Sequence, residues 1–224
     1  MIINVDSARL FKLNDNPPGP DGRVIYLMSR EQRLDDNWAF LHALEIAGSK
    51  KNVEVVFAVS ADFPVFSSRG FNFCIAGLKE TERRAEELGI NFKILICDDI
   101  AAELSEYISE SKASNAVCDF NPLRESLSVH TEIAKRISIP LIEVDSRNIV
   151  PCRFISAHQE YGAFTLRKKI EKVLPQFLTG FPLLEKLTAE VSGTTASGRE
   201  KTDWKKLTEK LMPEDNVKPI SGLK

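Results

Sequence analysis

The stretch VIYLMSREQRLDDNWAF, residues 24–40, contains the pattern that decides the fold. It opens with five continuous apolar or aromatic residues, which is typical of a strand buried on both faces. A loop with two arginines and several carboxylates follows. Trp38 then begins an apolar stripe at helical spacing, behind the candidate caps Asp36 and Asn37, and Gly48 is placed to end that helix. The stretch therefore predicts a strand, a charged loop and a helix in direct succession.

The same unit recurs along the chain. Four further apolar runs rich in branched residues predict strands: VEVVFAV (53–59), FKILIC (92–97), NAVCDF (115–120) and PLIEVD (140–145). Helical patterns lie between them, over residues 71–88, 100–108 and 129–137. Five strands alternating with four helices predict an α/β fold with a Rossmann-like, doubly wound, five-stranded parallel sheet. Right-handed crossovers then give the common strand order 3-2-1-4-5.

Composition divides the chain into four segments. Residues 1–22 end in NDNPPGPDG and are expected to be a lead-in with little structure of its own. Residues 23–150 contain the α/β domain. Residues 151–190 are a helical extension with a lysine-rich amphipathic helix, and residues 191–224 are a flexible linker with one short helix near its middle. The tail is expected to lead into a domain that this chain lacks.

Charge and hydropathy narrow the class of protein. The 224 residues include 30 basic and 32 acidic ones, a net charge of −2, which gives no general attraction to nucleic acid. The basic helix at 163–178 is therefore interpreted as a solvated face, with weak DNA contact as the alternative. No apolar run reaches the roughly 20 residues that span a bilayer, and the N-terminus lacks the layout of a signal peptide. We expect a cytoplasmic protein with no membrane partner.

Signals for catalysis are weak. The sequence contains neither GxGxxG nor a P-loop, and no metal site or catalytic triad is indicated. His42 and His130 lie in helical patterns, and each is expected to be a surface or half-buried helix residue. The four cysteines form no CxxC pair and are interpreted as buried thiols of a reducing compartment: Cys74, Cys97, Cys118 and Cys152.

A crevice is predicted where the strand order reverses, because ligands of open parallel sheets bind beyond the carboxyl ends of the strands at that point. The loops 28–37 and 119–125 meet there. Both contain charged side chains, namely Arg30, Arg33, Arg124, Glu31, Asp35, Asp36 and Asp119. These charges either brace the two loops by mutual salt bridges or hold a polar ligand.

The loop 60–73, SADFPVFSSRGFNF, brings four phenylalanines to the rim of the same crevice. Core packing under the sheet edge is one interpretation. An apolar wall for a flat aromatic ligand is the other.

Several motifs together resemble those of one family. GRVIYLMSREQRLDDNWAF is similar to the opening motif of class II cyclobutane-pyrimidine-dimer DNA photolyases, and GFNFCIAGLKETERRAEELGINF, VCDFNPLR, EVDSRNIVPC and QEYGAFTLRKKI continue the likeness in order. The resemblance covers roughly residues 22–172. It implies an N-terminal α/β domain that can hold an antenna chromophore such as a deazaflavin or folate. It also implies a separate helical domain that binds FAD and the DNA lesion, supplied by a missing part or by another chain.

In related photolyases the antenna is contacted by the loops after the first, second and fourth strands. The resemblance places this tentative site at Met28, Ser29, Arg30, Ser60, Phe63, Arg69, Phe73, Asp119, Phe120 and Arg124. It assigns no catalytic residue, and it implies that this chain alone does not repair DNA.

Three hypotheses follow. The chain is the antenna half of a class II photolyase, an independent photolyase-derived module for a nucleotide-like ligand or a protein partner, or a folded remnant that binds nothing. The first is preferred.

Overall fold

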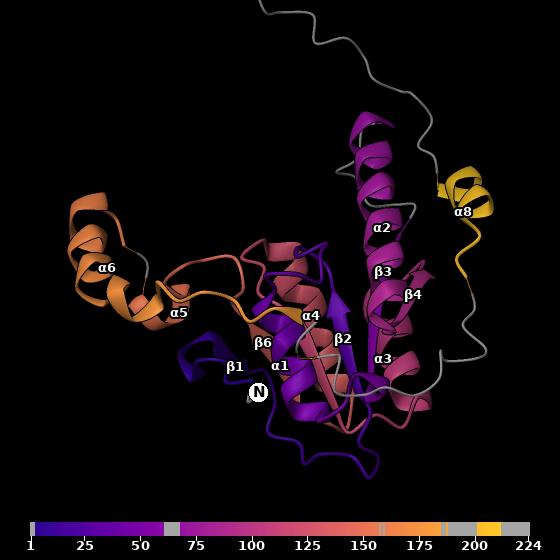
Figure 1. Cartoon of the computed structure of the whole chain (residues 1–224), viewed down its shortest axis with the longest axis horizontal. Helices are drawn as coiled ribbons and strands as arrows, with labels where there is room; N and C mark the ends of the chain where they lie inside the picture. Colours follow the sequence, from indigo (N-terminus) through magenta and orange to yellow (C-terminus); the bar gives the residue numbers. More distant parts are fainter. Residues whose placement is uncertain are drawn as a thin grey trace, which may run out of the picture.

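A computed structural model of the chain describes residues 3–60, 68–156, 158, 160–184, 187 and 201–211. A six-stranded sheet runs through the centre of the described part, in the order β1-β6-β5-β2-β3-β4 (Figure 1). The strands are β1 (Leu10–Lys12), β2 (Val24–Met28), β3 (Val53–Val59), β4 (Asn91–Ile96), β5 (Asn115–Asp119) and β6 (Leu141–Val144). The α-helices are α1 (Trp38–Ala47), α2 (Ser68–Leu88), α3 (Ile100–Glu110), α4 (Arg124–Arg136), α5 (Cys152–Ile155), α6 (Ala163–Phe177) and α8 (Trp204–Leu211). Two short 3-10 helices, η1 (Ser7–Arg9) and η2 (Lys50–Asn52), precede β1 and β3.

The five predicted strands form a parallel sheet in the predicted order, since β4-β3-β2-β5-β6 is 3-2-1-4-5. The register pairs Met28 with Phe57 and Leu27 with Cys118, so β2 lies at the centre with its carboxyl end between those of β3 and β5. The α/β fold class predicted from the alternating pattern is confirmed.

The lead-in was predicted wrongly as a segment with little structure. It contributes β1, a sixth strand antiparallel to β6, in which Leu10 pairs with Val144. The Asn14 amide donates to the carbonyls of Ala134 and Ile139 and fastens the segment to the sheet edge. Gly19 passes so close that a Cβ there would lie 2.4 Å from the Ala113 carbonyl oxygen.

The two faces of the sheet have separate cores because alternate side chains of a strand point to opposite faces. Val24, Tyr26 and Met28 of β2 pack in the core beneath α1 and α2. Ile25 and Leu27 pack in the other core, beneath α3 and α4. This is the doubly wound arrangement, with one pair of helices on each face.

Helix α1 begins and ends as predicted. The Asn37 side-chain oxygen accepts from the Phe40 N–H at 3.0 Å, which caps the N-terminus. Gly48 has φ +63° and donates its N–H to the Leu44 carbonyl at 3.0 Å. Asp36, the other candidate cap, instead takes φ +51° just outside the helix.

Two other helices begin earlier than predicted. Helix α2 starts at Ser68, so residues 68–73 of the predicted aromatic loop are helical, and Phe71 is buried in the core beneath α2. Helix α4 starts at Arg124 rather than near residue 129. Its first turn is therefore part of the region beyond the strand ends.

The C-terminal helices lie at the periphery. Helix α6 stands apart from the sheet, and α8 lies beside α2 (Figure 1). Leu207 and Leu211 of α8 are buried, and Trp204 donates its indole N–H to Glu82 of α2 at 2.6 Å. The predicted linker, apart from residues 201–211, lies outside the described residues.

The expected burial of three residues was wrong. Cys152 is exposed, whereas the other three cysteines are buried as predicted. His42 and His130 are both buried rather than at the surface or half-buried, at 7% and 6% exposure, because the faces of α1 and α4 that carry them pack inward. Within the described ranges, no helix is long and apolar enough to cross a membrane.

Candidate functional site

Asp119, at the end of β5, fixes the charged loop that follows β2. Its fully buried carboxylate accepts the backbone N–H groups of Ser29, Arg30 and Glu31 at 2.8, 2.8 and 2.9 Å. The Tyr26 hydroxyl donates to the other carboxylate oxygen at 2.5 Å. Burial and the neighbouring Asp119 charge raise the pKa of Tyr26, which keeps this hydroxyl a donor. The loop is therefore held rigidly against the next strand.

Glu31 provides a second brace. Its buried carboxylate forms ion pairs with Arg33 at 2.6 Å and with Arg147 at 3.1 Å. Burial raises the pKa of Glu31, and the Arg33 guanidinium opposes this rise. Asp35 turns away from the loop and pairs with Arg84 of α2.

The predicted bracing of the two loops exists, but its chemistry differs from the expectation. In the described part of the chain, no arginine of one loop pairs with a carboxylate of the other. The Asp119 carboxylate joins the two loops instead, by accepting backbone N–H groups of residues 29–31. A charge pattern in the sequence could not reveal this, because backbone donors have no sequence signature.

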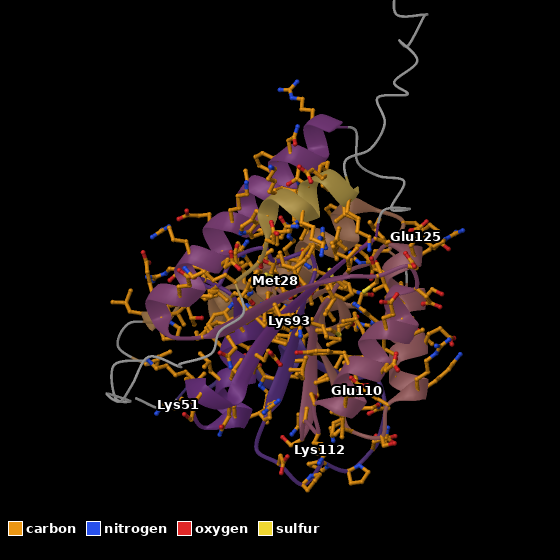
Figure 2. All side chains as sticks on the ribbon, turned by 90° about the vertical axis from the view of Figure 1, so that its right-hand side faces the viewer. Met28, Lys51, Lys93, Glu110, Lys112 and Glu125 are labelled. Carbon is orange, nitrogen blue, oxygen red and sulfur yellow. The ribbon has the colours of Figure 1, made fainter. Side chains whose placement is uncertain are left out.

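A cavity of about 400 Å³ opens beside the braced loop, between α3 and α4. Figure 2 labels two of its lining residues, Met28 and Glu125, at one end of the sheet, with Lys51 and Lys112 at the opposite end. The walls are mainly apolar: Leu27, Val56, Phe57, Ala58, Val59, Ile100, Leu104, Val129 and Ile133. The polar lining residues are Ser29, Arg30, Gln32, Asn121, Glu125, Ser126 and His130. This volume lies in the range of about 300–1,000 Å³ that is usual for small-molecule sites.

Three predicted site residues line this cavity. Met28 belongs to the end of β2, and Ser29 and Arg30 follow it in the braced loop. Among the described residues, the Arg30 guanidinium has no ion-pair partner. Asp119 lies beneath the loop and acts by positioning it.

The other predicted site residues lie outside the cavity. Phe120 is half-buried with the Arg153 guanidinium 5.5 Å from its ring, and Arg124 is exposed at the start of α4. Arg69 and Phe73 project from α2, and Phe73 is 83% exposed. Ser60 is half-buried after β3, and Phe63 lies outside the described residues.

Sequence reasoning missed the contribution of α4. Asn121 donates to the Ser126 hydroxyl at 2.8 Å, and its own side-chain oxygen accepts the Leu123 N–H at 3.2 Å. This turn starts the helix early, and it places Glu125 and His130 on the cavity wall. An Asn followed by Pro at the end of a predicted strand was the available signal for such a turn.

A larger cavity of about 660 Å³ lies next to Arg9, between the N-terminal segment and the residues after α6. Arg9 is only 5% exposed, and its guanidinium donates to the carbonyls of Asp145, Asn148 and Ile149 at 2.8–2.9 Å. These donors hold the fold together. The smaller cavity is the candidate site because it lies at the reversal of strand order. It also presents a polar group, the Arg30 guanidinium, that has no ion-pair partner among the described residues.

Comparison with known proteins identifies relatives. The family profile for DNA photolyase matches residues 24–188. The deoxyribodipyrimidine photo-lyase of Arabidopsis thaliana is 36% identical over 196 residues, which is 86% of this chain and 39% of that protein. The enzyme of the same name from Potorous tridactylus is 35% identical over 233 residues, 99% of this chain and 41% of that protein. The protein of the same name from Methanothermobacter thermautotrophicus is 34% identical over 176 residues, which is 78% of this chain and 39% of that protein. This chain spans about 40% of the length of these relatives.

Proposed function

This chain belongs to the DNA photolyase family, and on that premise we propose that it is the antenna domain of a class II enzyme for light-dependent repair of pyrimidine dimers. In this proposal the cavity between α3 and α4 holds a light-absorbing pigment of the deazaflavin or folate type. The pigment absorbs light and passes the energy on, and this domain makes and breaks no bond.

The observation that carries the proposal is the cavity at the reversal of strand order, with apolar walls and a polar rim. Apolar walls suit the faces of a fused-ring pigment, and a few polar groups fix its orientation. The efficiency of excitation-energy transfer depends on the orientation of the pigment, so a rigid site keeps that efficiency constant. Asp119 supplies this rigidity by holding the loop after β2, residues 29–31 at the rim of the cavity, against β5.

The partner in this proposal is a helical FAD-binding domain, in the same polypeptide or in another one. Large exposed apolar side chains along one segment favour such a contact: Ile149, Phe154, Tyr161, Phe164, Leu178 and Leu183. Flavin chemistry and lesion binding are assigned to that domain. The proposal assigns no catalytic residue to this chain, and we expect weak or no DNA binding without the partner.

The test is reconstitution of the purified chain with two pigments, 8-hydroxy-5-deazariboflavin and 5,10-methenyltetrahydrofolate. After removal of free pigment, we expect a near-UV or blue absorption band, and mass spectrometry of the denatured protein should identify the pigment. Ala58→Trp fills the cavity from β3 and should abolish the band. Ala76→Trp, on the exposed face of α2, is the matched control and should retain it. A folded wild-type chain that binds neither pigment contradicts the proposal.

A second candidate is a stand-alone module for a nucleotide-like ligand. The Arg30 side chain at the cavity rim favours this alternative, because it has no ion-pair partner in the described ranges and suits a phosphate. Flavin mononucleotide and AMP, added as competitors to the chain with bound pigment, distinguish the two candidates. Displacement of a bound pigment by AMP at comparable concentration supports the second candidate.

A further inference from the structure

His130 is the one histidine on the wall of the candidate cavity within the described part of the chain. It lies on α4 and is 6% exposed, among side chains that are otherwise mostly apolar. A buried imidazole in such surroundings needs partners, because a polar group without them costs free energy on burial. Its partners therefore decide what it can offer to a ligand.

One edge of the His130 ring is engaged with the sheet. Nδ1 lies 3.9 Å from the Cys118 sulfur of β5 and 3.5 Å from a carboxylate oxygen of Glu143 on β6. Glu143 is 1% exposed, and its other carboxylate oxygen accepts from Arg153 at 2.7 Å. The ring is thus oriented by two strands and indirectly by α5.

The other ring nitrogen, Nε2, has no hydrogen-bond partner among the described residues. Because Nδ1 faces the strands, Nε2 points away from them, toward the side of the ring that lines the cavity. The fold fixes this donor in direction without using it. The buried histidine of α1, His42, also has an Nε2 without a hydrogen-bond partner in the described part of the chain, but that nitrogen is fully buried, and His42 does not line either of the two cavities described above.

The surroundings favour the charged form of His130. Burial lowers its pKa, but Cys118 and the Glu143 carboxylate outweigh this effect and raise the pKa above its ordinary value. Burial raises the pKa of Cys118, so its thiol acts on His130 as a neutral hydrogen-bond partner, and the Glu143 carboxylate is the charged neighbour that favours the imidazolium. The charged groups that complete the environment are Arg153 behind Glu143, and Arg30 and Glu125 at the cavity rim.

We propose that His130 selects the ligand of this cavity by donating a hydrogen bond from Nε2 to an ionised ring oxygen. The inference rests on the proposed function and specifies the class of pigment: a planar heterocycle with an acidic ring hydroxyl, bound as its anion. A cationic donor in an apolar wall discriminates strongly between an ionised oxygen and a hydrogen atom at the same ring position.

The test uses two pigments that differ at one position, 8-hydroxy-5-deazariboflavin and 5-deazariboflavin. The wild-type chain should bind the hydroxylated pigment about 10- to 100-fold more tightly, the range expected for a hydrogen bond between charged groups. His130→Leu should remove this preference, and His130→Gln, which retains a neutral donor, should keep part of it. His42→Gln is the matched control because His42 is equally buried and pairs with Glu45 outside the cavity, and it should keep the full preference.

A second measurement separates binding from a structural role. The visible absorption of the hydroxylated pigment changes when its ring hydroxyl ionises, so the pKa of the bound pigment can be measured. Bound to the wild-type chain, the pigment should ionise at least about one pH unit lower than in water, since one unit corresponds to a tenfold preference for the anion. In His130→Leu the pKa should return to the value in water, and thermal melting of each variant checks the fold.

The outcomes are distinguishable. If the wild-type chain binds both pigments equally, or if His130→Leu keeps the preference and the shifted ionisation, the inference is wrong while the antenna proposal stands. If the wild-type chain binds neither pigment, the antenna proposal fails and this inference fails with it. Should His130→Leu not fold, the comparison of wild type with His130→Gln decides.

Discussion

Arg9 and His130 are two buried cations at the same end of the sheet, and they differ in what they leave free. Every contact of the Arg9 guanidinium serves the fold: three backbone carbonyls accept from it, and its carbon lies 5.2 and 5.5 Å from the rings of Trp38 and Phe177. His130 is paired along one edge only, and its other edge meets a cavity. A buried cation whose hydrogen bonds go to backbone carbonyls indicates a role in the fold, whereas one that is oriented on one side and open to an apolar cavity on the other indicates a binding site.

Removal of Arg9 should have the largest effect on stability. Arg9→Leu leaves three carbonyls without their donor and separates the N-terminal segment from the loop after β6. We expect a loss of about 3 kcal/mol in the free energy of unfolding, measured by urea denaturation, because each buried unsatisfied group costs about 1–3 kcal/mol and the three are not additive. In the absence of urea, the affinity of the folded Arg9→Leu variant for the pigment should stay within about twofold of the wild-type affinity. A loss of pigment affinity in a folded Arg9→Leu chain would show that Arg9 also contributes to binding, which contradicts the assigned difference between Arg9 and His130.

Asp119 should affect both stability and binding. Asp119→Asn replaces a carboxylate that accepts three backbone N–H groups and two hydroxyls with an amide that accepts fewer. We expect about 2 kcal/mol lower stability and at least about tenfold weaker pigment binding, because the rim loop loses its anchor. Exposed Arg124, which has no ion pair within the described residues, provides the control: Arg124→Gln should change stability by less than about 0.5 kcal/mol.

The contribution of His130 to stability should depend on pH. Its folded pKa is raised above the unfolded value of about 6.5. A raised pKa stabilises the fold fully below the unfolded value, and this stabilisation is lost as pH rises through the folded value. The stability difference between wild type and His130→Gln should therefore be largest below about pH 6.5 and shrink toward high pH. A difference that grows with pH would show that His130 is neutral in the fold.

The exposed cations of α6 should have the smallest effect. Lys168 is exposed and lies over the Phe164 ring, and half-buried Lys169 pairs with Glu160 at the edge of the molecule, so each contact is weak. Replacement of Arg167, Lys168 and Lys169 by alanine should shift Tm by less than about 2 °C. Any weak retention on duplex DNA should fade between 50 and 200 mM salt, because counterion release makes such contacts steeply salt-dependent. Retention on DNA that persists at about 200 mM salt would show that α6 binds DNA, which contradicts its interpretation as a solvated face.

Much of the fold could be predicted from residues 24–145, because strands buried on both faces read as continuous apolar runs and Asn37 and Gly48 are strong cap signals. Strand β1 could not, since three residues give no periodicity and its pairing depends on distant groups such as the Asn14 contacts.

The position of the candidate site was predictable from strand order, but most of its chemistry was not. Met28, Ser29 and Arg30 follow directly from the end of β2. The sequence predicts a surface or half-buried helix position for His130, and its role could not be predicted because it depends on Glu143, which lies on strand β6. Side chains that act through a partner on a distant strand leave no local pattern.

The central claim is that the cavity between α3 and α4 holds the pigment. The most direct measurement is a crystal structure of the chain with bound 8-hydroxy-5-deazariboflavin. The account predicts ring density between α3 and α4, in contact with Met28 and with the ring oxygen within hydrogen-bond distance of His130 Nε2. Ring density in the larger cavity beside Arg9, with the space between α3 and α4 empty, would contradict it.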